Sequence, residues 1–281
     1  MILVTGATGK VGAEAVRLLA AQNHPTRALV RDRSRAPGGL GSAVEIVVGD
    51  FDQPGTLDAA MRGIETVLLV SPAVPDQEIA VIDSAVRNGV THIAKITSKA
   101  SADSPVERRR GQAQIEAHLQ GAGVAFTLLR SNAYMQNLLA MAPMIARTNG
   151  FVMSAGDGRI GMIDARDVAA AAAVVVAQPG EHAGNTYWLT GPDLISYSNV
   201  AAELSVALGR SIDYLRTTPA EHRAAMIKAG VPEAVATSNA QAFGLIAEGD
   251  AAWLSQDVAT ITGTSPRDLH TFVMDHLPAF T

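Results

Sequence analysis

The sequence predicts an α/β protein with a Rossmann-type, doubly wound parallel sheet and a smaller, mostly helical C-terminal lobe. Along the first half of the 281-residue chain, apolar stretches rich in Val, Ile and Leu alternate with helical patterns. Within these stretches apolar and polar residues do not alternate, which is typical of strands covered on both faces. A glycine-rich turn, GATGKVG, follows the first stretch. Strand–helix repeats of this kind predict a parallel sheet.

Six strands and four helices are expected before Arg130. The predicted strands are residues 2–5, 27–30, 44–48, 66–70, 92–97 and 125–129, and the predicted helices are 11–21, 56–61, 77–87 and 107–120. Glycine lies close to the end of the last two helices, in RNGV and QGAGV. Glycine is common there because it adopts the left-handed conformation without a steric penalty.

After Arg130 the regular alternation ends. FVMSAGDGRIGMID is expected to form short strands around a turn, ARDVAAAAAVVVA a buried helix, and NTYWLTG one more strand. From Pro192 helices dominate, including residues 200–208 and 221–229. The predicted domains are a dinucleotide-binding domain, 1–150, that also receives 165–191, and a substrate lobe, 192–281, to which 151–164 contribute.

Composition argues against several classes of function. The net charge is −5 and the pI is about 5.8, without a basic patch, so neither nucleic acid nor a membrane is expected as a partner. The absence of cysteine excludes disulfides and thiolate catalysis and fits the reducing cytoplasm, where we expect the protein. The seven histidines are scattered without metal-ligand spacing, so no metal is expected. The oligomeric state, monomer or homodimer, stays open.

The turn GATGKVG lies between the first predicted strand and helix, where glycines allow a tight turn and a close approach of backbone N–H groups to a ligand. The start of a helix carries about half a positive charge, which favours a pyrophosphate. A purely structural turn is the alternative, but this position in the fold favours dinucleotide binding. The predicted cofactor contacts in the turn are Gly6, Thr8, Gly9, Lys10, Val11 and Gly12.

The end of the second predicted strand favours NADPH over NADH. Proteins that bind NAD place a carboxylate there for the ribose hydroxyl, whereas this chain has Arg31 followed by Arg33 and Arg35. Guanidinium groups suit a 2′-phosphate, and we expect Arg31 and Arg35 to bind it. Asp32 follows Arg31 and could reach a hydroxyl, so NADH is expected to bind more weakly rather than not at all.

The spacing of VTGATGKVG resembles that of the extended and atypical short-chain dehydrogenase/reductases. Four later stretches are similar to the NmrA-like branch of these proteins: GDFDQPGTL, AFTLLRSNAYMQNL, IDARDVAAAAAVVV and YWLTGPDLISYSNVAAELSVALGR. That branch includes NADPH-dependent quinone and triphenylmethane-dye reductases and also dinucleotide-sensing regulators. The resemblance covers nearly the whole chain and implies that Asp50 and Phe51 lie beside the adenine.

The usual catalytic dyad of the wider superfamily is missing. Its members carry a Tyr, and a Lys four residues later, on the helix after the fifth strand. Here that helix, VERRRGQAQIEAHL, contains neither residue. When Glu116 is matched to the acidic residue that follows the dyad, the Tyr position falls near Arg108 and the Lys position near Gln112. Ordinary alcohol dehydrogenation is therefore not expected.

Other polar residues follow strand ends, where open α/β sheets bind ligands. Ser71 and Pro72 are expected to shape the wall near the nicotinamide ribose, and Thr97 and Ser98 to contact the cofactor. Three residues are candidates for a catalytic role: Gln112, which can hydrogen-bond but is no acid; Lys99, for which a surface position is the alternative; and Tyr134. Tyr134 resembles the aromatic residue that lines the site of dye reductases, with core packing as its alternative.

The predicted function is hydride transfer from NADPH to a flat, quinone-like or other conjugated, electron-poor acceptor. Such an acceptor spreads the added charge, so the protein mainly has to hold two flat groups in contact. One alternative is a redox sensor that binds NADP(H) without turnover. A weaker one is a biosynthetic reductase with its own acid, such as Tyr134. Met135, Met141, Met144, Met153 and Met162 are expected to fill the core or to line the acceptor pocket.

Overall fold

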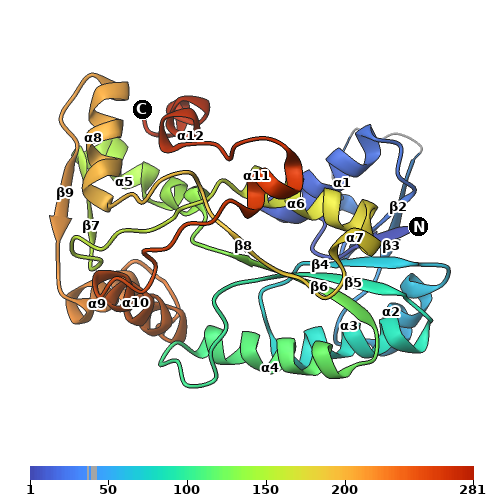
Figure 1. Cartoon of the computed structure of the whole chain (residues 1–281). Coiled ribbons are helices and arrows are strands. Elements are labelled where there is room, and N and C mark those ends of the chain that lie inside the picture. The colour runs from blue at the N-terminus through green and yellow to red at the C-terminus, as the bar shows by residue number, and fades with distance from the viewer. Residues whose placement is uncertain (37, 39–42) are drawn as a thin grey trace.

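The computed structural model describes residues 1–36, 38 and 43–281 (Figure 1). Seven parallel strands form the central sheet in the order β3-β2-β1-β4-β5-β6-β8. They are β1 Ile2–Val4, β2 Thr26–Val30, β3 Val44–Val48, β4 Thr66–Leu69, β5 His92–Thr97, β6 Ala125–Ser131 and β8 Thr186–Leu189. Because β1 pairs with both β2 and β4, the strand order reverses at β1, as in a doubly wound sheet. The predicted fold class is confirmed.

Helices cover both faces of the sheet (Figure 1). One layer contains α1 Lys10–Ala21, α6 Ala165–Ala177 and α11 Asp257–Thr262, and the other contains α2 Pro54–Met61, α3 Pro75–Arg87 and α4 Glu107–Gly121. Within β1, Ile2 and Val4 pack in the first layer and Leu3 in the second. Strands buried on both faces explain why the sequence shows continuous apolar stretches. The short helix α7 Pro179–His182 follows α6.

A second hydrophobic core holds the remaining elements together. They are η2 Met135–Met141, α5 Ala142–Thr148, β7 Gly150–Met153, α8 Tyr197–Leu208, β9 Asp213–Arg216, α10 Glu233–Ala247 and α12 Leu269–Asp275. Helix α9 Pro219–Lys228 packs on α10, and the short η3 Leu277–Ala279 ends next to Phe280, which belongs to this core. Strand β9, which the sequence did not indicate, pairs in parallel with β7. Of the short strands expected in residues 151–164, β7 covers the first part, and Ile160 and Ile163 form only isolated bridges.

The five methionines named above belong to this second core, four of them buried and Met144 packed against it. The division into domains at residues 150 and 192 stays a prediction. In the packing, η2 and α5 group with the C-terminal helices, while α11 returns to the sheet against α6. None of the helices in the described residues has the length and apolar character needed to span a membrane.

Candidate functional site

The glycine loop between β1 and α1 lies where the strand order reverses, and its three glycines differ in what they contact. A Cβ on Gly6, whose φ is +56°, would lie 2.5 Å from the Val70 carbonyl oxygen, and one on Gly12 would lie 2.3 Å from the Gly6 carbonyl oxygen. The fold itself therefore requires glycine at both positions. A Cβ on Gly9 would meet only the Gly6 carbonyl oxygen, at 3.3 Å, and Gly9 is exposed. Gly9 is therefore the least crowded of the three glycines, and its contact with a phosphate stays a prediction.

Gly9 is also the N-cap of α1, and no side chain caps this helix. The first N–H groups of a helix have no partners inside it, so they are available to an anion. Thr8 is exposed beside them, whereas the side chain of Val11 is buried in the core and leaves only its backbone for a ligand. Lys10 reaches across to the second lobe, where its Nζ lies 3.4 Å from the Gln136 carbonyl oxygen.

The arginines after β2 have separate environments. Arg33 donates to the Ile46 carbonyl oxygen at 2.7 Å, so its guanidinium is used by the fold. Arg31 and Arg35 are exposed. The Asp32 carboxylate accepts bonds from the backbone N–H and the hydroxyl of Ser34, which lowers its pKa. Asp32 therefore caps this local turn, and the roles of Arg31 and Arg35 toward a 2′-phosphate stay predictions.

Asp50 and Phe51 follow β3, as the sequence predicts. The Asp50 carboxylate accepts from the Asp52 N–H at 3.1 Å, and its own N–H donates to the Thr56 hydroxyl at 3.0 Å. Phe51 is half-buried against the core beneath α2 and α3. Asp50 therefore organises the turn into α2, and its role toward adenine stays a prediction.

A buried ion pair fixes the loop after β4. Lys95 of β5 and Glu78 of α3 are fully buried and bonded to each other, and Glu78 also accepts from the Ser71 hydroxyl at 2.6 Å. Desolvation lowers the pKa of Lys95, while the charge of Glu78 opposes this shift. Ala73, two residues after Ser71, has φ +66°, a strained value for a residue with a Cβ. The sheet interior thus holds Ser71 and Pro72 at the cavity edge.

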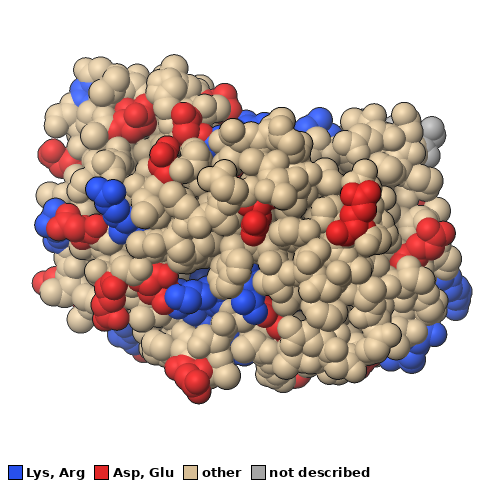
Figure 2. Space-filling view, in the orientation of Figure 1, with Lys and Arg blue, Asp and Glu red and all other residues tan. Residues whose placement is uncertain are grey.

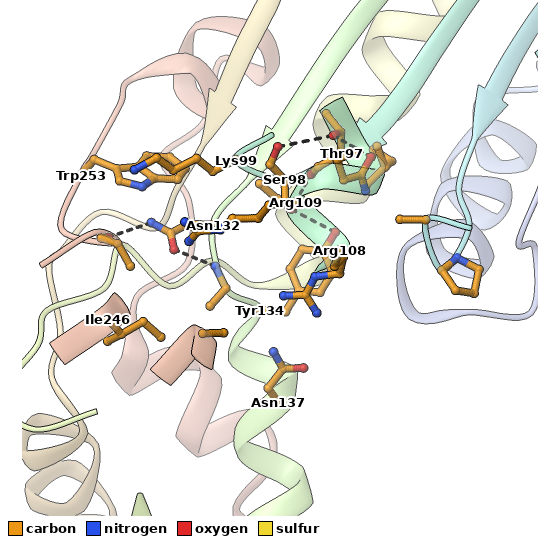
Figure 3. A pocket seen from close by; sticks show the side chains of 18 of the residues that line it. Thr97, Ser98, Lys99, Arg108, Arg109, Asn132, Tyr134, Asn137, Ile246 and Trp253 are labelled. Atoms are coloured by element: carbon orange, nitrogen blue, oxygen red, sulfur yellow. Dashed lines mark hydrogen bonds between the residues drawn. The ribbon is translucent and has the colours of Figure 1, made fainter. Parts of the chain in front are cut away.

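A cavity of about 480 Å³ lies at the carboxyl ends of β4, β5 and β6 (Figure 3). Its lining residues are Ser71, Pro72, Ala73, Ile96, Thr97, Ser98, Lys99, Arg108, Arg109, Gln112, Ser131, Asn132, Ala133, Tyr134, Asn137, Ala242, Ile246, Ala251 and Trp253. The sheet supplies one wall, and α10 with the segment after it supplies the facing wall. The cavity therefore lies between the sheet and the second hydrophobic core.

Thr97 and Gln112 belong to a buried polar network behind the cavity. The Thr97 hydroxyl lies 3.0 Å from the Gln112 Oε1 and 2.7 Å from the Glu116 Oε1. Arg130 bonds the same Glu116 carboxylate, and its guanidinium lies 5.0 Å from the centre of the Trp188 ring. These contacts fix the orientation of Gln112, which is 5 % exposed and faces the cavity.

Tyr134 follows β6 and lines the cavity. Its hydroxyl lies 3.2 Å from the Ser131 hydroxyl, and Ser131 also bonds the Thr97 carbonyl oxygen at 3.3 Å. Burial raises the pKa of the Tyr134 hydroxyl, and its neighbour Arg108 lowers it to a smaller extent. At neutral pH the phenol therefore keeps its proton. Ser98 also lines the cavity, and within the described part of the chain its buried hydroxyl has no hydrogen-bond partner.

Lys99 is part of an ion-pair cluster rather than an isolated surface lysine. Its Nζ lies 2.6 Å from Asp250, and Arg109 bonds the other oxygen of the same carboxylate at 2.6 Å. Beyond Lys99 a smaller hollow of about 280 Å³ is lined by Lys99, Trp188, Trp253, Leu254 and Ser255. The two tryptophan rings meet edge to face, with centres 5.1 Å apart. Lys99 and Trp253 line both this hollow and the main cavity.

The structure brings seven residues of the sequence-based prediction around one cavity: Ser71, Pro72, Thr97, Ser98, Lys99, Gln112 and Tyr134. Sequence reasoning missed a role for Arg108 and Arg109, and it missed the wall from Ala242 to Trp253. The charged run VERRRG on the helix that normally carries the dyad could have indicated the arginines. Nothing in residues 242–253 carries a motif, because they enter the site only through the packing of α10.

Residues 1–263 match the NmrA-like family. The chain belongs to the NmrA-like family. The NAD(P)H azoreductase of Xenophilus azovorans is 37% identical over 284 residues, which cover 100% of this chain and 99% of the relative.

Two solved structures share the architecture over nearly the whole chain. The NADPH-dependent quinone oxidoreductase of Escherichia coli, in complex with NADPH, has a TM-score of 0.90 at 29% identity, covering 99% of this chain and 100% of that one. Triphenylmethane reductase of Citrobacter sp., in complex with NADP(H), has a TM-score of 0.87 at 26% identity, covering 98% and 99%. The predicted family and fold are confirmed.

Proposed function

We propose that this NmrA-like protein is an NADPH-dependent oxidoreductase that reduces a quinone-like or other conjugated, electron-poor acceptor. The observation that carries the proposal is the cavity at the carboxyl ends of β4, β5 and β6, which lies along the same sheet edge as the glycine loop. Helix α4, which contributes to its wall, lacks the Tyr/Lys dyad. The names of the three relatives above, an azoreductase, a quinone reductase and a dye reductase, support the same acceptor class.

The residues present fit a dinucleotide. Exposed Gly9 and the uncapped start of α1 would hold the pyrophosphate, and Arg31 with Arg35 would hold a 2′-phosphate. Ser71, fixed by Glu78, and Gln112, fixed by Thr97, would bound the nicotinamide side. When bound, NADPH supplies a hydride.

The chain's own residues would position the acceptor, and none of them would have to act as an essential proton donor. Ile96, Ile246 and Trp253 give the cavity apolar surface against which a flat ring system packs. Quinone plus hydride plus one proton gives hydroquinone, and water can supply that proton because the added charge is delocalised. Tyr134, protonated at neutral pH, can donate a hydrogen bond to an acceptor oxygen without being essential.

Acceptor-dependent oxidation of NADPH tests the proposal. We expect turnover of quinones and azo dyes, and no turnover of simple ketones, because an unstabilised alkoxide needs a positioned acid. Tight NADPH binding with no oxidation by quinones, dyes, enones or imines would instead identify a redox sensor. We place the protein in the cytoplasm, in agreement with a chain that lacks cysteine.

A further inference from the structure

The acceptor cavity carries an excess of positive charge. Its charged lining residues are Lys99, Arg108 and Arg109, all basic. One carboxylate, that of Asp250, serves both Lys99 and Arg109. Figure 2 shows two blue patches near the middle of the face in view, with red carboxylate side chains beside them. With three cationic side chains and one carboxylate, the net charge in and around the cavity is about +2.

Arg108 contributes the unbalanced charge that is most available to a ligand. It lies in the first turn of α4, it is exposed, and its side chain is next to Tyr134 (Figure 3). Within the described residues it forms no ion pair and no hydrogen bond, whereas its neighbour Arg110 donates to the carbonyl oxygens of Ser104 and Pro105. Although water reaches Arg108, the surrounding cavity walls and the charge of Arg109 lower its pKa. An arginine stays protonated despite such a shift.

The Arg108 guanidinium makes no bond that stabilises the described part of the fold, and it does not line the glycine loop. No residue of the loop lines the cavity, so the phosphates held by the start of α1 lie at a separate place along the sheet edge. Apolar groups and a cationic end occur in the same cavity: Ile96, Ile246 and Trp253 beside Arg108. This combination is complementary to a flat molecule with one anionic substituent.

We propose that the preferred acceptor carries an anionic substituent, a carboxylate, sulfonate or phosphate, and that Arg108 binds it, with Lys99 and Arg109 adding to the field. The inference rests on the proposed function for its acceptor class, but the anion site itself can be tested without turnover. Arg108 occupies the helix position near which the superfamily tyrosine is expected, so charge recognition replaces proton donation at this point of the site.

Binding of inert probes tests the anion site directly. Naphthalenesulfonate and naphthalenesulfonamide have the same ring and nearly the same size, but only the sulfonate is charged. With the NADP-loaded protein, calorimetry is expected to give a Kd about tenfold lower for the sulfonate. Arg108→Gln should remove this difference, and Arg108→Lys should keep part of it. Arg110→Gln, which removes a charge from the same helix outside the cavity, should leave it unchanged.

Two results would overturn the inference: equal Kd values for both probes in the unmutated protein, or a preference for the sulfonate that persists in folded Arg108→Gln. If that variant does not fold, raised salt on the unmutated protein takes its place. The sulfonate preference should then fall, since surface charge attraction is screened, and a salt-independent preference would contradict a role for Arg108.

Turnover separates this inference from the proposed function. A naphthoquinone with a carboxymethyl group and its carboxamide have the same reactive ring, because the methylene insulates it from the charge. We expect kcat/KM to be about tenfold higher for the carboxylate, mainly through KM, and Arg108→Gln to equalise the two. Equal turnover of both would overturn the anion preference and leave the quinone reductase intact. Turnover of neither, with sulfonate binding retained, would overturn the proposed reaction and leave the anion site.

Discussion

The glycine loop and the acceptor cavity lie along one edge of the same sheet, but different groups form them. The loop consists of seven consecutive residues, Gly6–Gly12, and offers a ligand mainly backbone groups. Its shape is fixed by contacts within the loop, such as the bond from the Gly9 N–H to the Gly6 carbonyl oxygen. The cavity is formed by side chains from five segments far apart in the sequence. A site made of backbone groups from consecutive residues is visible in the sequence as a motif of fixed spacing. A site made of side chains from distant segments has no such motif, and its chemistry changes with single substitutions.

The largest expected effect is a loss of NADPH binding, and it distinguishes the glycine that contacts the ligand from the glycines that the fold requires. Gly9→Val should abolish measurable NADPH binding, a loss of at least about a hundredfold, because the branched side chain fills the space that a phosphate needs. Fluorescence titration with NADPH measures the loss, and thermal unfolding shows whether the variant folds.

Gly12→Ala is the matched comparison for Gly9→Val. Its Cβ would lie 2.3 Å from the Gly6 carbonyl oxygen, so this change should lower the melting temperature far more than Gly9→Val does. Normal NADPH affinity in a folded Gly9→Val protein would show that the loop is only structural.

The next effect concerns the choice of cofactor. NADPH is expected to bind about a hundredfold more tightly than NADH, because two charge-assisted bonds contribute about 3 kcal/mol before solvent screening is considered. Arg31→Asp should remove most of this preference. Arg33→Gln is the control, since Arg33 is bonded to the Ile46 carbonyl oxygen and should affect stability instead. Equal Kd values for both cofactors in the unmutated protein would indicate that Asp32 faces the ribose.

The fold was predictable where one physical rule dominates. Strands β3 and β5 begin and end where their apolar stretches predict, and α6 matches its alanine-rich run. Helices α2 and α3 begin two residues earlier than expected, at Pro54 and Pro75, because proline suits the first turn of a helix as well as a loop. Helix α8 also begins earlier, at Tyr197, because Ser196 and Asn199 form a capping box.

The site was predictable only in part. Tyr134, Gln112 and Lys99 follow strand ends or occupy the dyad helix, so topology alone brings them to the cavity. The Asp250 carboxylate that holds Lys99 and Arg109 is far away in the sequence and carries no local signal. Strand β9 was missed for a similar reason, since the four residues Asp213–Arg216 pair only with distant β7.

A smaller effect is expected inside the cavity. Gln112→Ala should lower the turnover of a quinone about tenfold, equivalent to about 1.4 kcal/mol, because it removes a hydrogen-bonding amide that Thr97 holds in place. Gln112→Glu keeps the size and adds a charge, so it should be at least as harmful. Steady-state kinetics with saturating NADPH measures both variants. Unchanged kcat and KM in Gln112→Ala would place Gln112 outside the reacting site.

The smallest expected effect tests the central claim, that hydride transfer to the acceptor proceeds without an essential side-chain acid. Tyr134→Phe keeps the ring and removes only the hydroxyl that lies 3.2 Å from Ser131. The measurement is the single-turnover rate of NADPH oxidation by a series of quinones of increasing electrophilicity, in the unmutated protein and in Tyr134→Phe. We expect the rate to rise along the series in both proteins and to differ between them by less than about threefold. A loss of about a hundredfold in Tyr134→Phe, with NADPH binding unchanged, would contradict the account and make Tyr134 the acid.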